Sequence, residues 1–98
     1  MERDEAIKRI RDALKKRSGK AWSVKHGRGT VSGWIDVDAP PARQANADAE
    51  RAELAKLLGL DAVHSGGVSI PASYEYRREY VDRAEGRTPS VIGVPYWD

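Results

Sequence analysis

Apolar residues recur every three or four positions near the start of the chain, and this spacing predicts an amphipathic helix over residues 2–17. Its acidic residues fall in the first turn and its basic residues in the last, which suits the helix dipole. Gly19 is expected to adopt the left-handed backbone conformation that ends a helix. The apolar stripe consists of Ala6, Ile7, Ile10, Ala13 and Leu14.

Residues 20–37 alternate between apolar and polar positions on both sides of a glycine-rich break, which is typical of a β-hairpin. A two-residue loop at Gly27 and Arg28, or a four-residue turn over 26–29, places Val24 opposite Val31. One face then carries Trp22, Val24, Val31, Ile35 and Val37. The other face carries Ser23, Lys25, Thr30, Ser32, Trp34 and Asp36. We expect helices to pack on the apolar face. Trp34, on the polar face, needs either a cover within the chain or a partner.

A linker with two consecutive prolines, which cannot join a sheet ladder, follows the hairpin and leads into a second predicted helix. This helix starts near Asn46 or Asp48 and ends at Gly59, with Leu60 folding back on its last turn. Its inner side carries Ala47, Arg51, Leu54, Ala55 and Leu58, with Leu57 at the margin.

The segment 71–85 predicts a third helix, with Ser73 as a candidate N-cap and Gly86 as its stop. Its inner stripe would be Tyr76, Tyr80, Val81 and Ala84, and its outer face Arg78, Glu79, Asp82 and Glu85. Because a lone hairpin is marginal in water, we expect a third strand at 68–70 or, alternatively, at 90–94. Tyr96 and Trp97 are expected to dock on the body, with Trp97 a candidate cover for Trp34.

These elements predict one α+β domain over residues 1–98, in the order helix, β-hairpin, helix, helix, with helices packed on one face of a small antiparallel sheet. The 40% hydrophobic and 33% charged composition is typical of a globular domain. The chain has no cysteine, so disulfides and thiol chemistry are excluded. No apolar run approaches the roughly 20 residues of a membrane span. The charged N-terminus lacks the apolar core of a signal peptide, so a cytoplasmic location is expected.

The sequence signals no catalytic, metal or cofactor site. Gly27, Gly29 and Gly33 are spaced one residue too widely for a dinucleotide fingerprint, and they precede a strand where that motif precedes a helix. His26 and His64 have no cluster of metal ligands beside them. An enzymatic role would need a polar cleft that holds one of these histidines next to a carboxylate.

The candidate site is a basic and aromatic set centred on the hairpin. Aromatic rings stack on bases while cations follow phosphates, so this combination favours nucleic acid. The net charge of +2 is too small to carry that argument, which therefore depends on where the cations lie. The basic run at 15–20 is also explained by helix-dipole complementation and solubility. The set consists of Lys16, Arg17, Lys20, Lys25, Arg28 and Trp34.

The leading hypothesis is a non-enzymatic binding module, with nucleic acid as the best single ligand. The alternative is a protein–protein adaptor or homodimerisation domain that uses Trp34 and the Tyr96–Trp97 tail as apolar anchors. No membrane partner is expected.

Two stretches also carry a family resemblance. The first contains Trp-Ser-Val at 22–24, Gly-Arg-Gly-Thr at 27–30 and Gly-Trp-Ile at 33–35, and the second runs from Val68 to Tyr80 and on through 83–86. Together they resemble a family of small uncharacterised bacterial proteins, cyanobacterial members among them. The resemblance covers about a third of the chain and implies kinship. It implies no activity, so no catalytic residue is carried over from it.

Overall fold

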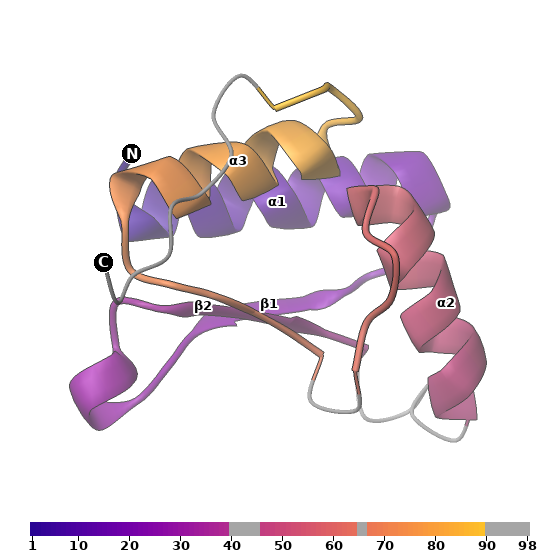
Figure 1. Cartoon of the computed structure of the whole chain (residues 1–98), viewed down its shortest axis with the longest axis horizontal. Coiled ribbons are helices and arrows are strands. Elements are labelled where there is room, and N and C mark those ends of the chain that lie inside the picture. Colours follow the sequence, from indigo (N-terminus) through magenta and orange to yellow (C-terminus); the bar gives the residue numbers. More distant parts are fainter. Residues whose placement is uncertain (40–45, 65–66, 90–98) are drawn as a thin grey trace.

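The computed structural model describes residues 1–39, 46–64 and 67–89, and it confirms the predicted α+β fold (Figure 1). The elements follow the order helix, strand, strand, helix, strand, helix, with one 3-10 turn between the first two strands. They are α1 (Arg3–Ser18), β1 (Ser23–His26), η1 (Gly29–Val31), β2 (Ile35–Asp38), α2 (Ala47–Leu58), β3 (Val68–Ile70) and α3 (Tyr74–Ala84).

The three strands form one antiparallel sheet in the order β1-β2-β3. The third strand at Val68–Ile70 is therefore confirmed, and the alternative at 90–94 lies outside the described residues. Val37 of the central strand lies opposite Val24 on one side and Val68 on the other. All three valines are buried, so the strand pairing aligns their side chains with the core.

The predicted hairpin register is wrong. His26 pairs with Ile35, so residues 27–34 form a long connection in place of a two-residue or four-residue turn. The Gly27 N–H donates to the Trp34 carbonyl at 3.0 Å, and the chain between them includes η1. Val31, predicted in the core, is 44% exposed. Trp34, predicted on the polar strand face, is half-buried at the end of this connection.

Long-range contacts explain this register. Arg3 Nη1 donates to the Ser32 carbonyl at 2.9 Å, and Arg77 Nη2 donates to the Gly33 carbonyl at 2.6 Å. These two arginines come from α1 and α3, so two helices that precede and follow the loop in the sequence hold it in place. The observed register also places Lys25 opposite Asp36 across the strand pair, an arrangement that opposite charges favour even without a direct ion pair. The rules that relate turn sequence to hairpin register consider only the turn residues, so they take account of none of these long-range contacts.

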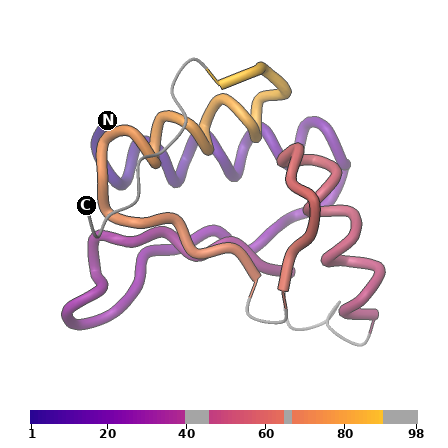
Figure 2. The backbone as a smooth tube through the Cα atoms, in the orientation of Figure 1, coloured from indigo at the N-terminus to yellow at the C-terminus, as the bar shows by residue number. Residues whose placement is uncertain are grey.

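Helices α1 and α3 lie side by side over one face of the sheet, and α2 lies at one end of the layered pair (Figures 1 and 2). The expected packing face is confirmed, because Trp22, Val24 and Ile35 are all buried in the core. The opposite face of the sheet is polar. Its side chains are Ser23, Lys25, Asp36, Asp38 and Ser69.

The predicted C-terminal ends of α1 and α2 and the predicted N-cap of α3 are confirmed, although α3 begins at Tyr74 and not at residue 71. Gly19 and Gly59 both have positive φ, at 74° and 67°. The Leu60 N–H donates to the Ala55 carbonyl at 2.8 Å, which closes α2. The Ser73 hydroxyl accepts from the Tyr76 N–H at 3.0 Å and caps α3. Local sequence therefore set these three helix ends.

The predicted outer face of α3 needs correction at Asp82, whose side chain is only 14% exposed beside Arg87, and above all at Glu79. Glu79 was expected in solvent but is only 5% exposed, while Tyr76 and Tyr80 of the predicted inner stripe are half-buried. Glu79 Oε2 accepts from Arg83 Nε at 2.8 Å. A buried carboxylate is tolerated when it is paired and hydrogen-bonded, and Arg83 supplies that partner.

Candidate anion-binding surface

The last turns of all three helices meet at one end of the molecule (Figure 1). A helix C-terminus leaves carbonyl groups without intrahelical partners and carries partial negative charge. Three such ends in one place attract cationic side chains. Each helix also has a basic residue in its last turn.

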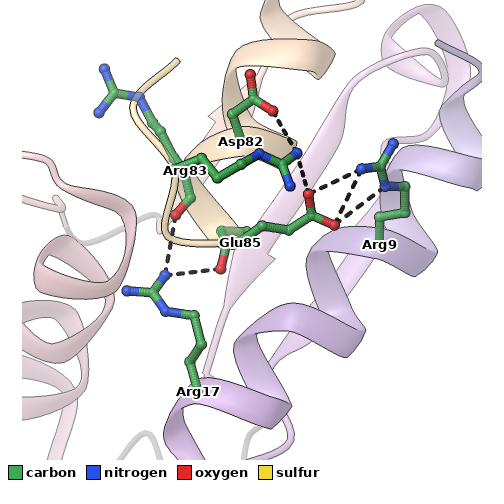
Figure 3. Close-up of polar contacts among 7 residues, drawn as sticks. Arg9, Arg17, Asp82, Arg83 and Glu85 are labelled. Carbon is green, nitrogen blue, oxygen red and sulfur yellow. Dashed lines mark hydrogen bonds and ion pairs between the residues drawn. The ribbon is translucent and has the colours of Figure 1, made fainter. Parts of the chain in front are cut away.

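Arg17, at the end of α1, joins the ends of the other two helices. Its Nη1 atom donates to the Leu57 carbonyl at 2.7 Å, the Arg83 carbonyl at 3.1 Å and the Ala84 carbonyl at 2.9 Å. Figure 3 shows its guanidinium pointing at the end of α3. Gly86 lies directly against it, since a Cβ atom at this glycine would be 3.4 Å from Arg17 Cζ. One exposed cation therefore satisfies carbonyls of α2 and α3 together.

Arg83 makes the reciprocal connection from α3 to α2. Its Nη1 atom donates to the carbonyls of Leu58 and Gly59, both at 3.1 Å, while its Nε atom binds Glu79. Its guanidinium carbon also lies 5.8 Å from the centre of the Tyr80 ring. Arg83 is thereby held on three sides.

The carboxylates near this end are paired. Glu85 receives two N–H groups of Arg9, the nearest at 3.0 Å (Figure 3). Arg87 Nη2 lies 2.8 Å from Asp82 and 2.5 Å from Glu85. The hydrogen bond to Asp82 raises the pKa of the Arg87 guanidinium. These ion pairs neutralise most of the local negative charge.

The lysines of the same end point into solvent. Lys15 and Lys16 of α1 and Lys56 of α2 are exposed, and none of them has an ion pair with a described residue. Lys20 differs, because its Nζ atom binds Glu53 of α2 at 2.8 Å. The lysines therefore leave positive charge that the protein itself does not neutralise.

Two hollows flank Arg17. One, of about 300 Å³, is lined by the cations Arg17, Lys56, Arg83 and Arg87, and no carboxylate lines it. The other, of about 620 Å³, lies along α1 and is lined by Arg9, Asp12, Ala13, Lys16, Arg17 and Glu85. Of these two hollows, only the smaller is lined by charged side chains that are all cations. This feature suits an anion.

The structure brings together only part of the set predicted from the sequence. Lys16, Arg17 and Lys20 lie at the meeting point of the helix ends. Lys25 instead lies on the outer face of the sheet, opposite Asp36. Arg28 and Trp34 lie at the two ends of the 27–34 connection, across the molecule from the helix ends (Figure 1).

Sequence reasoning missed three residues of the cationic hollow: Lys56, Arg83 and Arg87. A signal for two of them was present, because Lys56 and Arg83 are basic residues in the last turn of a helix. The sequence did not show that these turns would meet.

The histidines give no sign of a catalytic or metal site. The His26 ring Nδ1 lies 2.7 Å from the Gly27 carbonyl, and neither His26 nor His64 lines either hollow beside Arg17. Within residues 1–39, 46–64 and 67–89, no three histidine or acidic side chains are grouped so as to hold a metal ion. Over the same ranges, no helix combines the length and apolar character needed to cross a bilayer.

Comparison of the chain with protein-family models, with curated proteins and with solved structures gives no match.

Proposed function

We propose that this protein is a non-enzymatic binding module that contacts the phosphate backbone of nucleic acids through its basic end. The basic end is the surface formed by Lys15, Lys16, Arg17, Lys20, Lys56, Arg83 and Arg87. One observation carries the proposal: nearby carboxylates such as Glu85 and Glu53 are paired, whereas Lys15, Lys16 and Lys56 extend into solvent without a described carboxylate partner.

This distribution of charge favours contacts with phosphates over sequence-specific contacts with bases. Cations that are free of intramolecular partners can replace the counterions on a nucleic acid, which is the main source of sequence-independent affinity. Base stacking needs exposed aromatic rings, and the charged side chains of the basic end supply none. The outer face of the sheet is a poorer platform, because Asp36 and Asp38 lie on it. We therefore expect binding with a steep dependence on salt and little sequence preference.

The location of Trp34 changes the hypothesis drawn from the sequence. This side chain is half-buried and belongs to the connection at the far end of the molecule (Figure 1). Lys25 has Asp36 opposite it on the adjacent strand. The proposed contact surface is therefore the basic end, and the hairpin residues Lys25, Arg28 and Trp34 are left outside it.

The test is a titration of fluorescently labelled single- and double-stranded oligonucleotides at low salt, followed by anisotropy. The double variant Lys16→Glu with Lys56→Glu should abolish most binding, because it reverses two charges that the fold does not use. The matched control is Lys25→Glu with Arg28→Glu, which makes the same charge change on the hairpin. The proposal fails if the wild type shows no saturable binding, or if both double variants lose affinity equally.

A second candidate function is association with another protein or with another copy of the chain. The end of the molecule opposite the basic end favours it. Val31 is 44% exposed and Tyr74 is 64% exposed, and the Arg77–Gly33 hydrogen bond holds their two segments together. Of the anchors predicted from the sequence, Trp34 is half-buried, and residues 96 and 97 lie outside the described residues. Sedimentation analysis of the wild type and Tyr74→Ser tests this candidate. A single monomeric species at high protein concentration would rule out the homodimer.

A further inference from the structure

We infer that the 300 Å³ hollow between the ends of α2 and α3 is a binding site for a single phosphate group. The inference rests on the proposed function only for the source of that phosphate, a nucleic acid backbone. The site itself follows from which side chains line the hollow and from how they are held.

The lining brings cations together from four parts of the chain. Arg17 comes from α1, Lys56 from α2 and Arg83 from α3, while Arg87 comes from the segment that follows α3. The carboxylates that pair with Arg83 and Arg87, namely Glu79, Asp82 and Glu85, lie outside the lining. An anion in the hollow would therefore meet cationic groups without facing an opposing carboxylate.

The three arginines are fixed before any ligand arrives. Arg17 and Arg83 each use Nη1 to bind helix carbonyls, and Arg87 uses Nη2 to bind Asp82 and Glu85. These contacts hold the guanidinium planes in place, so a ligand need not order them on binding. The contacts of Arg17 and Arg83 also neutralise the partial negative charge of helix carbonyls that would otherwise repel an anion.

Several N–H groups around the hollow remain available. In the described part of the chain, Arg17 Nε and Nη2, Arg83 Nη2 and Lys56 Nζ make no hydrogen bond. Guanidinium groups present paired N–H donors that match the oxygens of a phosphate, and an ammonium adds a point charge. Two fixed arginines and a movable lysine thus provide the donors that a phosphate needs.

The size and lining of the hollow limit the ligand. A volume of 300 Å³ lies at the lower limit for small-molecule pockets, and no aromatic side chain lines it. A nucleobase would find no ring on which to stack. We therefore assign the hollow to the phosphate itself, with the attached sugar and base lying outside it.

The first experiment titrates the ¹⁵N-labelled protein with inorganic phosphate while chloride keeps the ionic strength constant. The expected result is saturable shifts in the backbone amides of Gly59, Gly86 and Arg87. Lys56→Gln should weaken phosphate binding by about fivefold or more, because it removes one charge-assisted hydrogen bond. The matched control, Lys25→Gln, removes an exposed lysine that also has no ion pair, and it should bind phosphate as the wild type does.

The second experiment asks whether inorganic phosphate displaces a labelled oligonucleotide, and whether Lys56→Gln weakens both ligands in parallel. Displacement together with parallel weakening supports a backbone phosphate as the occupant. If phosphate saturates the site but no oligonucleotide binds, the site stands and the proposed function falls. If oligonucleotides bind but phosphate produces no more shift than chloride, the inference falls and the proposed function stands.

Discussion

The Nη1 atom of Arg17 lies 2.9 Å from the carbonyl oxygen of Ala84, so a side chain from the last turn of α1 caps the C-terminal end of α3. The same atom reaches the Leu57 carbonyl at the end of α2. Arg17 was predicted as a contact for nucleic acid, and its first role is to hold three helix ends together. The positive charge around Arg17 is therefore a consequence of this structural role.

Arg17→Met should lower the free energy of unfolding by about 2 kcal/mol, because several carbonyls lose a charged donor while the aliphatic stem is kept. Equilibrium unfolding in urea measures the change. Lys16→Met is the matched control, since Lys16 is exposed and has no ion pair, and it should change stability by less than about 0.5 kcal/mol. Equal effects of the two substitutions would show that the capping contacts do not stabilise the fold.

Glu79 and Arg83 should be energetically coupled. A double-mutant cycle with Glu79→Gln and Arg83→Met should give a coupling of about 2 kcal/mol, because the side chains of Glu79 and Arg83 are only 6% and 18% exposed. The pair Lys8 and Asp12 has the same four-residue spacing on an exposed helix face and should show a much weaker coupling, because water screens exposed charges. A coupling as small for Glu79 as for Asp12 would contradict the structural role of the buried carboxylate.

The hairpin register can be tested with two valines. Val37→Ala should destabilise the protein by about 1.5–3 kcal/mol, because Val37 is 1% exposed in the core. Val31→Ala should cost less than about 0.5 kcal/mol, because Val31 is 44% exposed. The register predicted from the sequence requires both valines in the core. Similar losses in thermal or urea unfolding would favour that register over the observed one.

Gly27 should not tolerate a side chain. A Cβ atom there would lie 2.3 Å from the Val31 carbonyl oxygen, so Gly27→Ala should cost more than about 2 kcal/mol and disturb the 27–34 connection. Gly29→Ala is the control, because its Cβ would meet open space and only its φ of 58° is unfavourable. We expect about 1 kcal/mol for Gly29→Ala. A smaller loss at Gly27 than at Gly29 would place the connection elsewhere.

Tyr80 should make stability fall at alkaline pH. Burial raises the pKa of the Tyr80 phenol, and the nearby Glu79 adds to the shift. Since the folded-state pKa lies above the unfolded one, this contribution is complete below about pH 10 and declines as pH rises through the folded pKa. Tyr80→Phe should flatten the alkaline fall in unfolding free energy. The exposed Tyr74→Phe should leave the fall unchanged, and an identical effect of both would contradict the assignment.

The agreement between prediction and structure was good where the signal is local. The helix stripe at Ile7, Ile10 and Leu14 and the cap glycines at 19 and 59 all lie where the pattern placed them. Helix periodicity and capping depend on residues within a few positions of each other, so the sequence carries this information directly. The same holds for Ser73, whose hydroxyl finds an amide three residues later.

The errors share a different cause. The register of residues 27–34 depends on Arg3 and Arg77, which lie far away in the chain. The burial of Glu79 depends on how α3 packs against the rest of the fold, because its partner Arg83 is only four residues away on the same helix. The basic end was only partly predicted for the same reason. Lys56, Arg83 and Arg87 join Arg17 because helices that are separate in sequence end at one place.

The amino-acid sequence by itself thus determined the helices, their ends, the apolar face of the hairpin and the class of the fold, because each follows from short-range spacing and from the need to bury one side of every element. Only the tertiary structure decided the strand register and which cations surround the hollow at the helix ends. Those features depend on contacts between segments dozens of residues apart, and such contacts leave no periodic trace along the chain.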